Sequence, residues 1–428
     1  MHPDIEFQTQ ETIKAFQEMK LKKTLKYLSQ HSPFYQRLFK SNNFQISDIQ
    51  LLEDLVKLPT TSKDDLQKHN DDFLCVPKHK IIDYVTTSGT LGAPVTFALT
   101  DKDLDRLAYN EAVSFASTGM GSNDTIQLMT TMDRCFMAGL AYFLGARKVG
   151  ASIVRVGAGV PELQWDSIRR FKPTYLICVP SFLLKLIDHA QQNDISINDS
   201  SVKAAICIGE PIRNSDFSLN TLGQNIADTW DIQLYSTYAS TEMSTAFTEC
   251  SAQKGGHLHP DLIIVEILDE QQQPVEEGEL GELTITTLGV EAMPLLRFRT
   301  GDMVHAHLNP CDCGRNTLRL GPIMGRKQQM IKYKGTTLYP PAIVDILNQF
   351  QTLEGFVIEI KHNNQGLDDL IIKVACVHPP EQFLQDIQNT FKSKLRVIPS
   401  IELCDLVTIQ KLQRSGLDRK TRLVIDKR

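Results

Sequence analysis

The stretch Tyr84-Val-Thr-Thr-Ser-Gly-Thr-Leu-Gly-Ala-Pro94 is the part of the chain around which its other motifs can be arranged. Its first three residues are typical of the end of a buried β-strand, and hydroxyl-bearing residues and glycines follow. Glycine adopts backbone angles closed to other residues and lets a polyanion approach the main chain, while Ser and Thr supply hydroxyl donors. We therefore predict a phosphate-binding loop, whose expected contacts are Thr87, Ser88, Gly89, Thr90 and Gly92.

By itself this loop also fits an ordinary turn, which is the commoner structure for such a composition. The spacing is not that of a Walker loop, because no Lys-Ser or Lys-Thr pair follows the second glycine, and it is not a dinucleotide fingerprint. Motifs farther along the chain are needed to distinguish a phosphate-binding loop from an ordinary turn.

Length and composition narrow the class of protein. A chain of 428 residues usually divides into two or more domains. The net charge of −6, without a basic stripe, argues against nucleic acid as the main partner. No apolar run has membrane-spanning length and no leader-like segment opens the sequence, so we expect no membrane partner and a cytoplasmic location. The nine cysteines are too scattered for a disulfide framework.

Strand-like and helix-like segments alternate in the first half of the chain. The expected helices cover residues 101–118, 139–148, 161–171 and 181–191, and the expected strands cover residues 125–129, 152–156, 175–179 and 202–208. This alternation predicts parallel sheets covered by helices, with ligands at the strand ends. Residues 281–287 alternate with a two-residue period, which predicts an antiparallel, partly exposed strand. Earlier, residues 10–40 show helical spacing, and Thr61 or Ser62 is expected to cap a short helix.

Four further motifs are expected at strand ends or turns. They are Gly209-Glu-Pro211, Tyr235-Ser-Thr-Tyr-Ala-Ser-Thr-Glu242, Arg297-Phe-Arg-Thr-Gly-Asp302 and Gly325-Arg326. We expect the second to follow a strand directly, and the third to place its aspartate behind a glycine turn. The fourth precedes a Lys- and Gln-rich segment that has the composition of a linker. Each motif is weak alone, but their order is specific.

In this order the motifs resemble those of the adenylate-forming superfamily of acyl-CoA ligases, adenylation domains and luciferases. Four stretches resemble the phenylacetate-CoA ligase branch more narrowly. They are His31-Ser-Pro-Phe-Tyr35, Leu58-Pro-Thr-Thr-Ser-Lys-Asp-Asp-Leu66, Tyr238-Ala-Ser-Thr-Glu242 and Gln413-Arg-Ser…Lys420-Thr-Arg422. The resemblance implies an α/β fold with a large N-terminal adenylate-forming domain, residues 1–326, that has βα-type sheets and a β-barrel-like subdomain. It also implies a small mobile α+β C-terminal domain, residues 327–428, with the active site between the two.

The resemblance also implies an activity. Such enzymes use ATP and Mg²⁺ to convert a carboxylic acid, here expected to be aromatic, to an acyl adenylate, and then transfer the acyl group to coenzyme A. A first alternative keeps the adenylation and loads the phosphopantetheine arm of a carrier protein. A second is a degenerate nucleotide-binding homologue, suggested by Ala93 and Gln328, which replace a usual lysine and aspartate. A homodimer is a family-level expectation.

Residue roles follow from the matching motifs. The hydroxyl-rich loop would hold the β- and γ-phosphates of ATP. Glu242 matches the glutamate that the family links to magnesium. Proteins usually hold Mg²⁺ through one or two carboxylates together with phosphate oxygens of the substrate. Tyr238 would stack on adenine. The remaining expected nucleotide contacts are Gly209, Glu210, Pro211, Ala239, Ser240 and Thr241. Each residue also has an ordinary structural interpretation, such as a core ring for Tyr238.

Three further residues match functional positions of the family: Asp302 as a nucleotide contact, and Arg326 and Lys420, with Glu242, as catalytic residues. Asp302 would accept hydrogen bonds from both ribose hydroxyls, a role that needs lone pairs and no proton. Arg326 would contact phosphate or ribose near the hinge. Lys420 would bridge the substrate carboxylate and the α-phosphate and so reduce the repulsion between two anions.

Several residues depart from the family pattern. Ala239 replaces a common glycine, and Gln328 and Gln329 stand where the branch has two aspartates, one of them the hinge. A glutamine can still form hydrogen bonds, so the hinge can persist without its charge. Adenylation could be intact while the second half-reaction is slow or uses another acceptor.

Four residues have the composition of a structural zinc site. Cys311 and Cys313 lie in one Pro/Gly turn, and Cys250 and His257 precede them. Three thiolates and one imidazole match the Cys3His preference of zinc and leave no position for a catalytic water. His259 could replace His257, and the cysteines could instead be free or redox-linked thiols.

The acyl pocket of the family corresponds to residues 129–139. Thr131 is expected to line this pocket and Phe136 to form an aromatic wall. Thr131, Asp133 and Arg134 occupy positions where phenylacetate activators tend to have glycine and tyrosine. The acid is therefore left open among aryl, arylalkanoic and short acyl acids.

Overall fold

The computed structural model describes residues 3–87, 95–363, 367–414 and 422–428. Six residues singled out above lie outside these ranges, namely Ser88, Gly89, Thr90, Gly92, Ala93 and Lys420. Within the described ranges, no helix is both long and apolar enough to cross a membrane.

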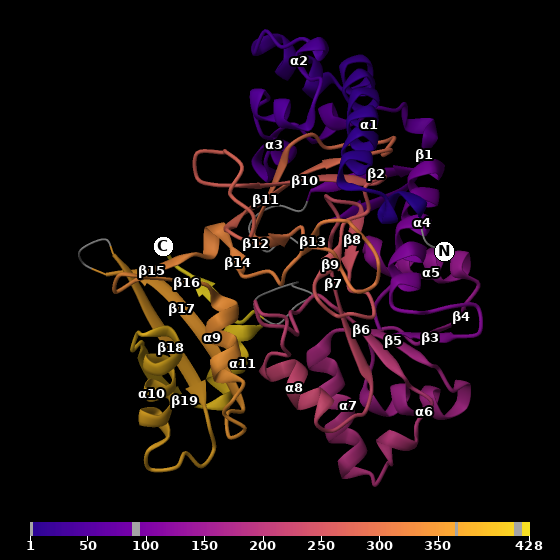
Figure 1. Cartoon of the computed structure of the whole chain (residues 1–428). Coiled ribbons are helices and arrows are strands. Elements are labelled where there is room, and N and C mark those ends of the chain that lie inside the picture. Colours follow the sequence, from indigo (N-terminus) through magenta and orange to yellow (C-terminus); the bar gives the residue numbers. More distant parts are fainter. Residues whose placement is uncertain (1–2, 88–94, 364–366, 415–421) are drawn as a thin grey trace.

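The N-terminal segment forms helices that cover one end of the larger part of the molecule (Figure 1). After the 3-10 turn η1 (Asp4–Phe7) come α1 (Gln10–His31), α2 (Pro33–Ser41) and α3 (Lys63–Lys68). The expected helix over residues 10–40 is divided at Ser32, which ends α1 and caps α2, because Pro33 has no N–H to continue the first helix. Ser62 caps α3 as expected, and its N–H donates to Asp65 Oδ2 at 2.8 Å.

The Thr/Ser/Gly stretch joins the two strands of an antiparallel hairpin, β1 (Ile81–Thr86) and β2 (Thr96–Thr100). Thr87 N donates to Val95 O at 3.0 Å, and Val95 N donates to Thr87 Oγ1 at 3.1 Å. The hairpin is therefore closed at the base of residues 88–94. The expectation of a buried strand holds for Val85 but is wrong for Tyr84, which is 50% exposed because one face of the hairpin is open.

The expected βα alternation produces a six-stranded sheet in the order β4-β3-β5-β6-β7-β8. Its strands are β3 (Thr125–Leu128), β4 (Ser152–Arg155), β5 (Tyr175–Cys178), β6 (Ala204–Ile208), β7 (Gln233–Ser240) and β8 (Thr245–Thr248). The helices are α4 (Asp101–Ser117), α5 (Met137–Val149), α6 (Pro161–Phe171), α7 (Pro180–Gln192) and α8 (Thr221–Ala227). Only the β7–β8 pair is antiparallel, so the prediction of a largely parallel sheet is confirmed.

Helices cover both faces of this sheet, because alternate strand residues point to opposite faces. On one face Leu176 packs in a core that includes Trp165 of α6 and Leu183 of α7. On the other face Ile177 packs in a second core that includes Phe115 of α4.

A second sheet, predominantly antiparallel, crosses the middle of the molecule (Figure 1). It contains β9 (Gly256–His257), β10 (Ile263–Leu268), β11 (Leu280–Thr287), β12 (Phe298–His307), β13 (Arg319–Leu320) and β14 (Gly325–Arg326). The expected antiparallel strand is β11, but its expected partial exposure is wrong, since residues 281–287 are all buried. The hydroxyls of Thr286 and Thr287 are satisfied internally by the N–H groups of Arg297 and Leu295. Threonines can therefore alternate with apolar residues without facing water.

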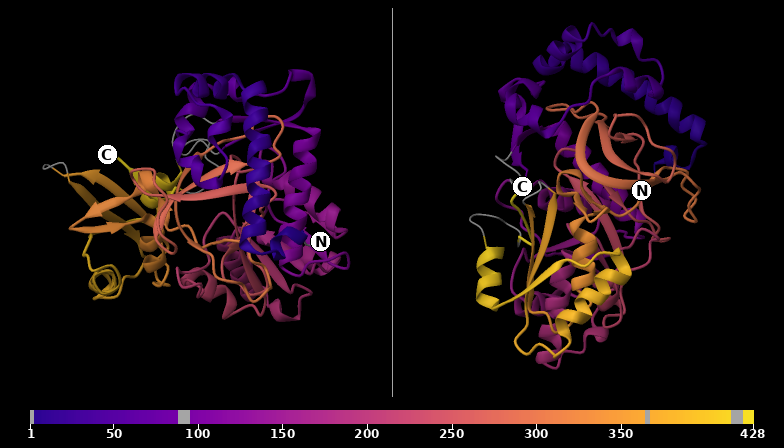
Figure 2. Two further views of the ribbon diagram at one scale, coloured as in Figure 1. Left: turned by 45° about the horizontal axis from the view of Figure 1, so that its top comes forward. Right: turned by 90° about the vertical axis from the view of Figure 1, so that its left-hand side faces the viewer.

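The C-terminal part has its own sheet and core, beside the larger part (Figure 2). The hairpin of β15 (Ile331–Tyr333) and β16 (Thr336–Leu338) precedes a sheet ordered β19-β18-β17-β20. That sheet has the strands β17 (Gly355–His362), β18 (Asp368–Ala375), β19 (Ser400–Cys404) and β20 (Val424–Asp426). The helices are α9 (Pro340–Leu347), α10 (Phe383–Leu395) and α11 (Leu406–Gln413). Thr221 N of α8 donates to Asp345 Oδ1 of α9 at 2.9 Å and links the two parts.

Candidate functional site

Asp302 is the centre of a group of predicted site residues that three strands bring together. Tyr238 Oη of β7 donates to Asp302 Oδ2 at 2.6 Å. Arg326 of β14 is the cross-strand partner of Asp302 in β12, and its Nε lies 3.4 Å from Asp302 Oδ1. Asp302 lies within β12, after Gly301 with a φ of +79°, so the expectation of a separate turn is wrong. Pairing of β12 with β14 extends the strand through the glycine.

The electrostatic state of this group follows from its burial. Asp302 is 8% exposed, and burial raises the pKa of its carboxyl group while Arg326 and the Tyr238 hydroxyl act in the opposite direction. Burial and the adjacent Asp302 raise the pKa of the Tyr238 phenol well above its ordinary value. Tyr238 therefore stays protonated at neutral pH and remains a donor to Asp302.

The Tyr/Ser/Thr/Glu motif lies partly inside a strand. β7 continues to Ser240 because β8 pairs with it, so the expectation that the motif only follows a strand is wrong. The turn to β8 places Glu242 at a partly exposed position, and Ser240 Oγ accepts the N–H of Met243 at 3.3 Å. Thr241, Ala239 and Ser240 lie next to it in the chain, so the motif stays together in space.

A buried arginine that the sequence did not reveal supports this turn. Arg106 of α4 donates from Nη1 to Ser244 O at 2.5 Å and from Nη2 to Thr245 Oγ1 at 3.0 Å. It also donates to Leu262 O and Leu288 O, so it ties the turn to both ends of the β10–β11 segment. The available signal was an arginine beside apolar residues in the expected helix over residues 101–118.

The Gly-Glu-Pro motif follows β6 as expected, and Gly209 has a φ of +76°. Glu210 accepts hydrogen bonds from Ser181 N and Ser181 Oγ, both at 2.9 Å. The carboxylate thus satisfies N–H and hydroxyl donors at the start of α7. Pro211 is exposed beside it.

The expected acyl-pocket segment lies next to the hairpin. Thr86 N of β1 donates to Cys135 O at 3.0 Å. Thr131 Oγ1 is hydrogen-bonded to the Asp133 carboxylate, and Phe136 directly precedes α5 and is half-buried. The segment therefore lies beside the base of residues 88–94, and its role as an acyl pocket stays a prediction.

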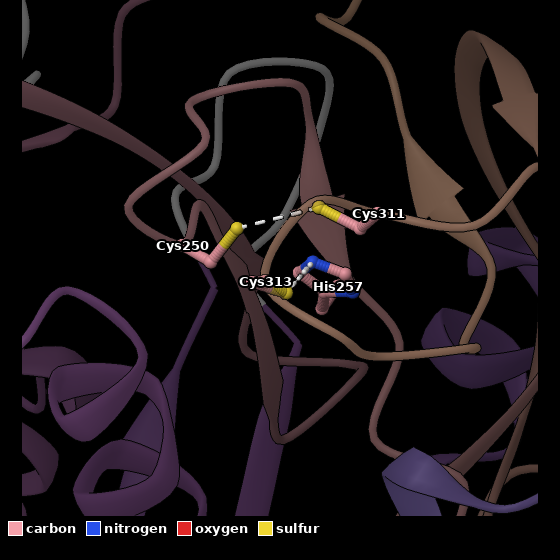
Figure 3. A group of neighbouring side chains, drawn as sticks. All are labelled: Cys250, His257, Cys311 and Cys313. Atoms are coloured by element: carbon pink, nitrogen blue, oxygen red, sulfur yellow. Dashed lines mark hydrogen bonds between the residues drawn. The ribbon is translucent and has the colours of Figure 1, made fainter.

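The four expected metal ligands converge on one point (Figure 3). The Sγ atoms of Cys250 and Cys311 are 3.6 Å apart, and Cys313 Sγ lies 3.4 Å from His257 Nε2. All four potential ligand atoms lie within 4.8 Å of one another. Residues far apart in the sequence thus place three sulfurs and one ring nitrogen around a common centre.

Surrounding groups orient these side chains. His257 Nδ1 lies 2.9 Å from Thr317 Oγ1, which directs Nε2 at the sulfurs, and burial lowers the pKa of His257, which favours the neutral ring. Hydrogen bonding from Cys250 holds the pKa of the Cys313 thiol well below its usual range. Arg315 Nη1 also donates to Cys313 Sγ at 3.5 Å.

His259 is excluded from this cluster by its own partners. Its Nδ1 lies 2.5 Å from Glu6 Oε1, and its Nε2 lies 3.4 Å from Ser114 Oγ. Glu6 Oε2 also accepts from Arg315 Nε at 2.6 Å. Of the two histidines left open by the sequence, the geometry selects His257. Glu6 was missed by sequence reasoning, since nothing local distinguishes it from a solvated acid.

Family models match both parts of the chain. Residues 21–292 match the model described as AMP-binding enzyme, and residues 335–428 match that of the AMP-binding enzyme C-terminal domain. The chain belongs to the AMP-binding enzyme family. The resemblance to adenylate-forming proteins, expected from the order of the motifs, is confirmed.

Curated relatives of this AMP-binding enzyme cover most of its length. It is 28% identical over 383 residues to the phenylacetate-coenzyme A ligase of Thermus thermophilus, with 88% of this chain and 84% of the relative aligned. It is also 28% identical over 381 residues to the phenylacetate-coenzyme A ligase of Escherichia coli, with 86% and 84% aligned.

Solved structures share the fold of this AMP-binding enzyme. The crystal structure of 2-hydroxyisobutyryl-CoA ligase in complex with 2-HIB-AMP has a TM-score of 0.84 at 24% identity, covering 98% of this chain and 89% of the other. The same ligase with 2-HIB-AMP and CoA has a TM-score of 0.72 at 24% identity, with 99% and 91% covered. The expected fold class is confirmed.

Proposed function

We propose that the protein is an AMP-forming acid–thiol ligase that makes acyl-CoA thioesters. In the first step a carboxylate oxygen attacks the α-phosphorus of ATP, the bond to pyrophosphate breaks, and an acyl adenylate forms. In the second step the deprotonated thiol of coenzyme A attacks the acyl carbon, and AMP leaves with the electrons of the broken C–O bond. The observation that carries the proposal is the convergence of Tyr238, Asp302 and Arg326 in a chain of the AMP-binding enzyme family.

The three converging side chains suit the nucleoside part of ATP. The ionised carboxylate of Asp302 has two oxygens with several lone pairs, so it can accept from ribose hydroxyls while it holds Tyr238. Its two internal partners fix its orientation before the ligand arrives, which reduces the cost of ordering on binding. The Tyr238 ring would contact adenine, and Arg326 would add positive charge near the phosphates.

Binding of Mg²⁺ and binding of the ATP phosphates by the hydroxyl-rich loop remain predictions from the sequence. Glu242 stands partly exposed in the turn after β7, where a carboxylate could bind Mg²⁺ together with phosphate oxygens. Thr87 is fixed at the base of the hairpin by its two bonds with Val95. Lys420 and the remaining loop residues lie outside the described residues, so their roles rest on the matching motifs alone.

The substrate acid and the acceptor belong to the same proposal. The names of the sequence relatives favour phenylacetate or a related aromatic acid and coenzyme A. Arg134, three residues after the expected pocket residue Thr131, would suit a polar or anionic substituent on that acid. Transfer to a carrier protein, a homodimer, a cytoplasmic location and a domain boundary between residues 326 and 327 stay predictions.

We also propose that Cys250, His257, Cys311 and Cys313 bind a structural zinc ion. The donor set is the Cys3His combination that zinc prefers, and the potential ligand atoms already lie within 4.8 Å of one another. Thr317 supplies the outer hydrogen bond that zinc-binding histidines usually have. A zinc ion with four protein ligands would stabilise the fold and would not bind a catalytic water.

The experiment that tests the activity is a screen of acids for pyrophosphate release with ATP and Mg²⁺. Benzoate, phenylacetate and 2-hydroxyisobutyrate would each be tested with and without coenzyme A. We expect release with at least one acid, thioester only when coenzyme A is present, and loss of acid-dependent pyrophosphate–ATP exchange in Lys420→Ala. Arg419→Ala is the matched control and should retain exchange. Absence of release with every acid would contradict the proposal, and wild-type exchange in Lys420→Ala would contradict the role of Lys420.

A further inference from the structure

Two sets of polar contacts hold the segment that joins the two parts of the chain, one from each part. We call them the two anchors. On the side of the larger part, Lys327 Nζ lies 3.0 Å from Glu282 Oε2 of β11. The Glu282 side chain is buried and also accepts from Arg299 Nε and Nη2 at 3.0 and 2.7 Å. Because buried and networked ion pairs keep their geometry better than exposed ones, Lys327 is held to the second sheet.

On the other side, the guanidinium group of Arg428 binds two successive parts of the linker backbone. Its Nη2 donates to Gln328 O at 3.1 Å, and its Nη1 donates to Met330 O at 2.8 Å. Asp426 Oδ2 lies 2.6 Å from Nη2, and Asp368 Oδ2 lies 3.0 Å from Nη1. The Arg428 side chain is only 16% exposed, so the group is fixed within the C-terminal part.

These anchors leave a very short free segment between them. Lys327 is bound to Glu282 of β11, whereas the carbonyl of Gln328 is bound by Arg428, which pairs with Asp368 of β18 and Asp426 of β20. The short 3-10 turn η7 (Lys327–Gln329) spans the junction, and Met330 N donates to Lys327 O at 3.2 Å. A rotation of one part against the other is therefore confined to the backbone torsions between Lys327 and the Gln328 carbonyl.

We infer that Arg428 is a positioning residue that fixes the pivot of the C-terminal part for the thioester-forming step. Gln328 lacks a side-chain charge that could hold the pivot, and Arg428 supplies a charged donor to the backbone of the same residue. The planar guanidinium can bind two carbonyls and two carboxylates at once, which an ammonium cannot do with the same geometry.

This inference rests on the proposed function, because only a two-step ligase needs the C-terminal part in two defined orientations. When Arg428 holds the pivot at one place, the C-terminal part rotates to a single orientation. In that orientation the thiol of coenzyme A can reach the acyl carbon. When the pivot is loose, many orientations compete and the fraction in the productive one falls. Adenylation precedes the rotation, so we expect it to depend less on the pivot.

The test compares Arg428→Gln with Lys427→Gln, which removes a neighbouring charge that pairs at 2.9 Å with Glu359 of the C-terminal sheet. Amide hydrogen exchange is measured without substrate. We expect the Met330 amide to exchange at least 10-fold faster in Arg428→Gln, and the amides of β17 and β18 to keep their rates. Arg428→Lys should lie between Arg428→Gln and the wild type.

The activity measurement separates the two half-reactions, using whichever of benzoate, phenylacetate or 2-hydroxyisobutyrate supports pyrophosphate release. We expect Arg428→Gln to lower thioester formation at least 5-fold and pyrophosphate–ATP exchange less than 2-fold. Unchanged exchange of the Met330 amide, faster exchange throughout the C-terminal sheet, or an equal loss in Lys427→Gln would overturn the inference. If no acid reacts, the proposed function fails, and the amide exchange still decides whether Arg428 holds the pivot.

Discussion

The hydroxyl of Tyr238 donates a 2.6 Å hydrogen bond to Asp302 and so connects the parallel sheet to the antiparallel sheet. The two residues come from β7 and β12, 64 positions apart in the chain. A short bond from a neutral phenol to a carboxylate is a charge-assisted interaction, stronger than a bond between neutral groups. The bond therefore sets the position of the carboxylate that we assign to ribose.

Replacement of Tyr238 by phenylalanine tests that bond directly. The ring remains for adenine, but Asp302 loses one donor and its pKa rises further. Since a hydrogen bond to a charged group contributes about 1.5–3 kcal/mol, we expect the KM for ATP to rise about 10-fold or more, with a smaller change in kcat. Tyr235→Phe on the same strand is the matched control. An unchanged KM for ATP in Tyr238→Phe would contradict the assignment.

Loss of the Glu6 carboxylate is expected to destabilise the fold. Glu6 is fully buried and binds both Arg315 and His259. Glu6→Gln leaves a buried guanidinium with a weaker partner, so the free energy of unfolding should fall by about 3 kcal/mol. Chemical denaturation measures the change. Asp4→Asn, an exposed acid in the same 3-10 turn, should have little effect. Equal effects of the two substitutions would contradict the importance of the buried contacts.

Glu111 predicts a dependence of stability on pH. It lies in α4 with Asn110 Nδ2 at 3.1 Å, and burial raises the pKa of its carboxyl group to about 8. A raised carboxyl pKa means that the folded state binds the proton more tightly than the unfolded state. The resulting contribution to the free energy of unfolding is therefore full below the unfolded-state pKa and is lost as pH rises toward 8.

The substitution Glu111→Gln should remove that dependence. The amide is neutral at every pH, so the variant should gain stability relative to the wild type as pH rises from 5 to 8. The difference should be on the order of 3 kcal/mol at pH 7. Denaturant unfolding at several pH values measures it, with the exposed Glu162→Gln as the control. If the free energies of unfolding of the variant and the wild type differ by the same amount from pH 5 to 8, the prediction of a protonated Glu111 is contradicted.

Metal content tests the Cys3His centre. Wild-type protein grown with zinc should contain about one equivalent per chain, and Cys313→Ser should contain much less. Chelation should lower the melting temperature of the wild type more than that of the variant, because only the former has a metal to lose. Cys404→Ser, outside the cluster, is the control. Wild-type protein without zinc after growth in zinc-replete medium would contradict the assignment.

The elements that were predictable from the sequence are those with a local cause. The helix bounds over residues 161–171 follow from Pro161 at the start and the apolar period within. The turn sequence around Cys311 and Cys313 revealed the metal candidate because sulfurs in one Pro/Gly turn are unusual. The burial of β11 was not predictable from its own residues. An alternating threonine has the same sequence pattern whether its hydroxyl faces water or accepts from a backbone N–H.

Side chains whose roles depend on distant backbone were not predictable. Arg106 of α4 binds carbonyls in the turn between β7 and β8 and next to the ends of β10 and β11. Arg428 binds carbonyls 98 and 100 positions away. Glu210 was assigned to the nucleotide by its motif, while its observed contacts are with Ser181 at the start of α7. Such partners become known only when the chain is folded, because no local pattern encodes them.

The Cys/His cluster has a further consequence for the nucleotide site. Cys250 and Cys311 lie 61 positions apart, and the segment between them contains β10, β11 and Asp302. A metal bound to both would act as a cross-link that closes this loop and removes conformations from the unfolded chain, equivalent to about 4 kcal/mol by the loop-entropy relation for disulfides. Zinc supply could then set the fraction of molecules able to hold ATP, although the metal would never touch the nucleotide.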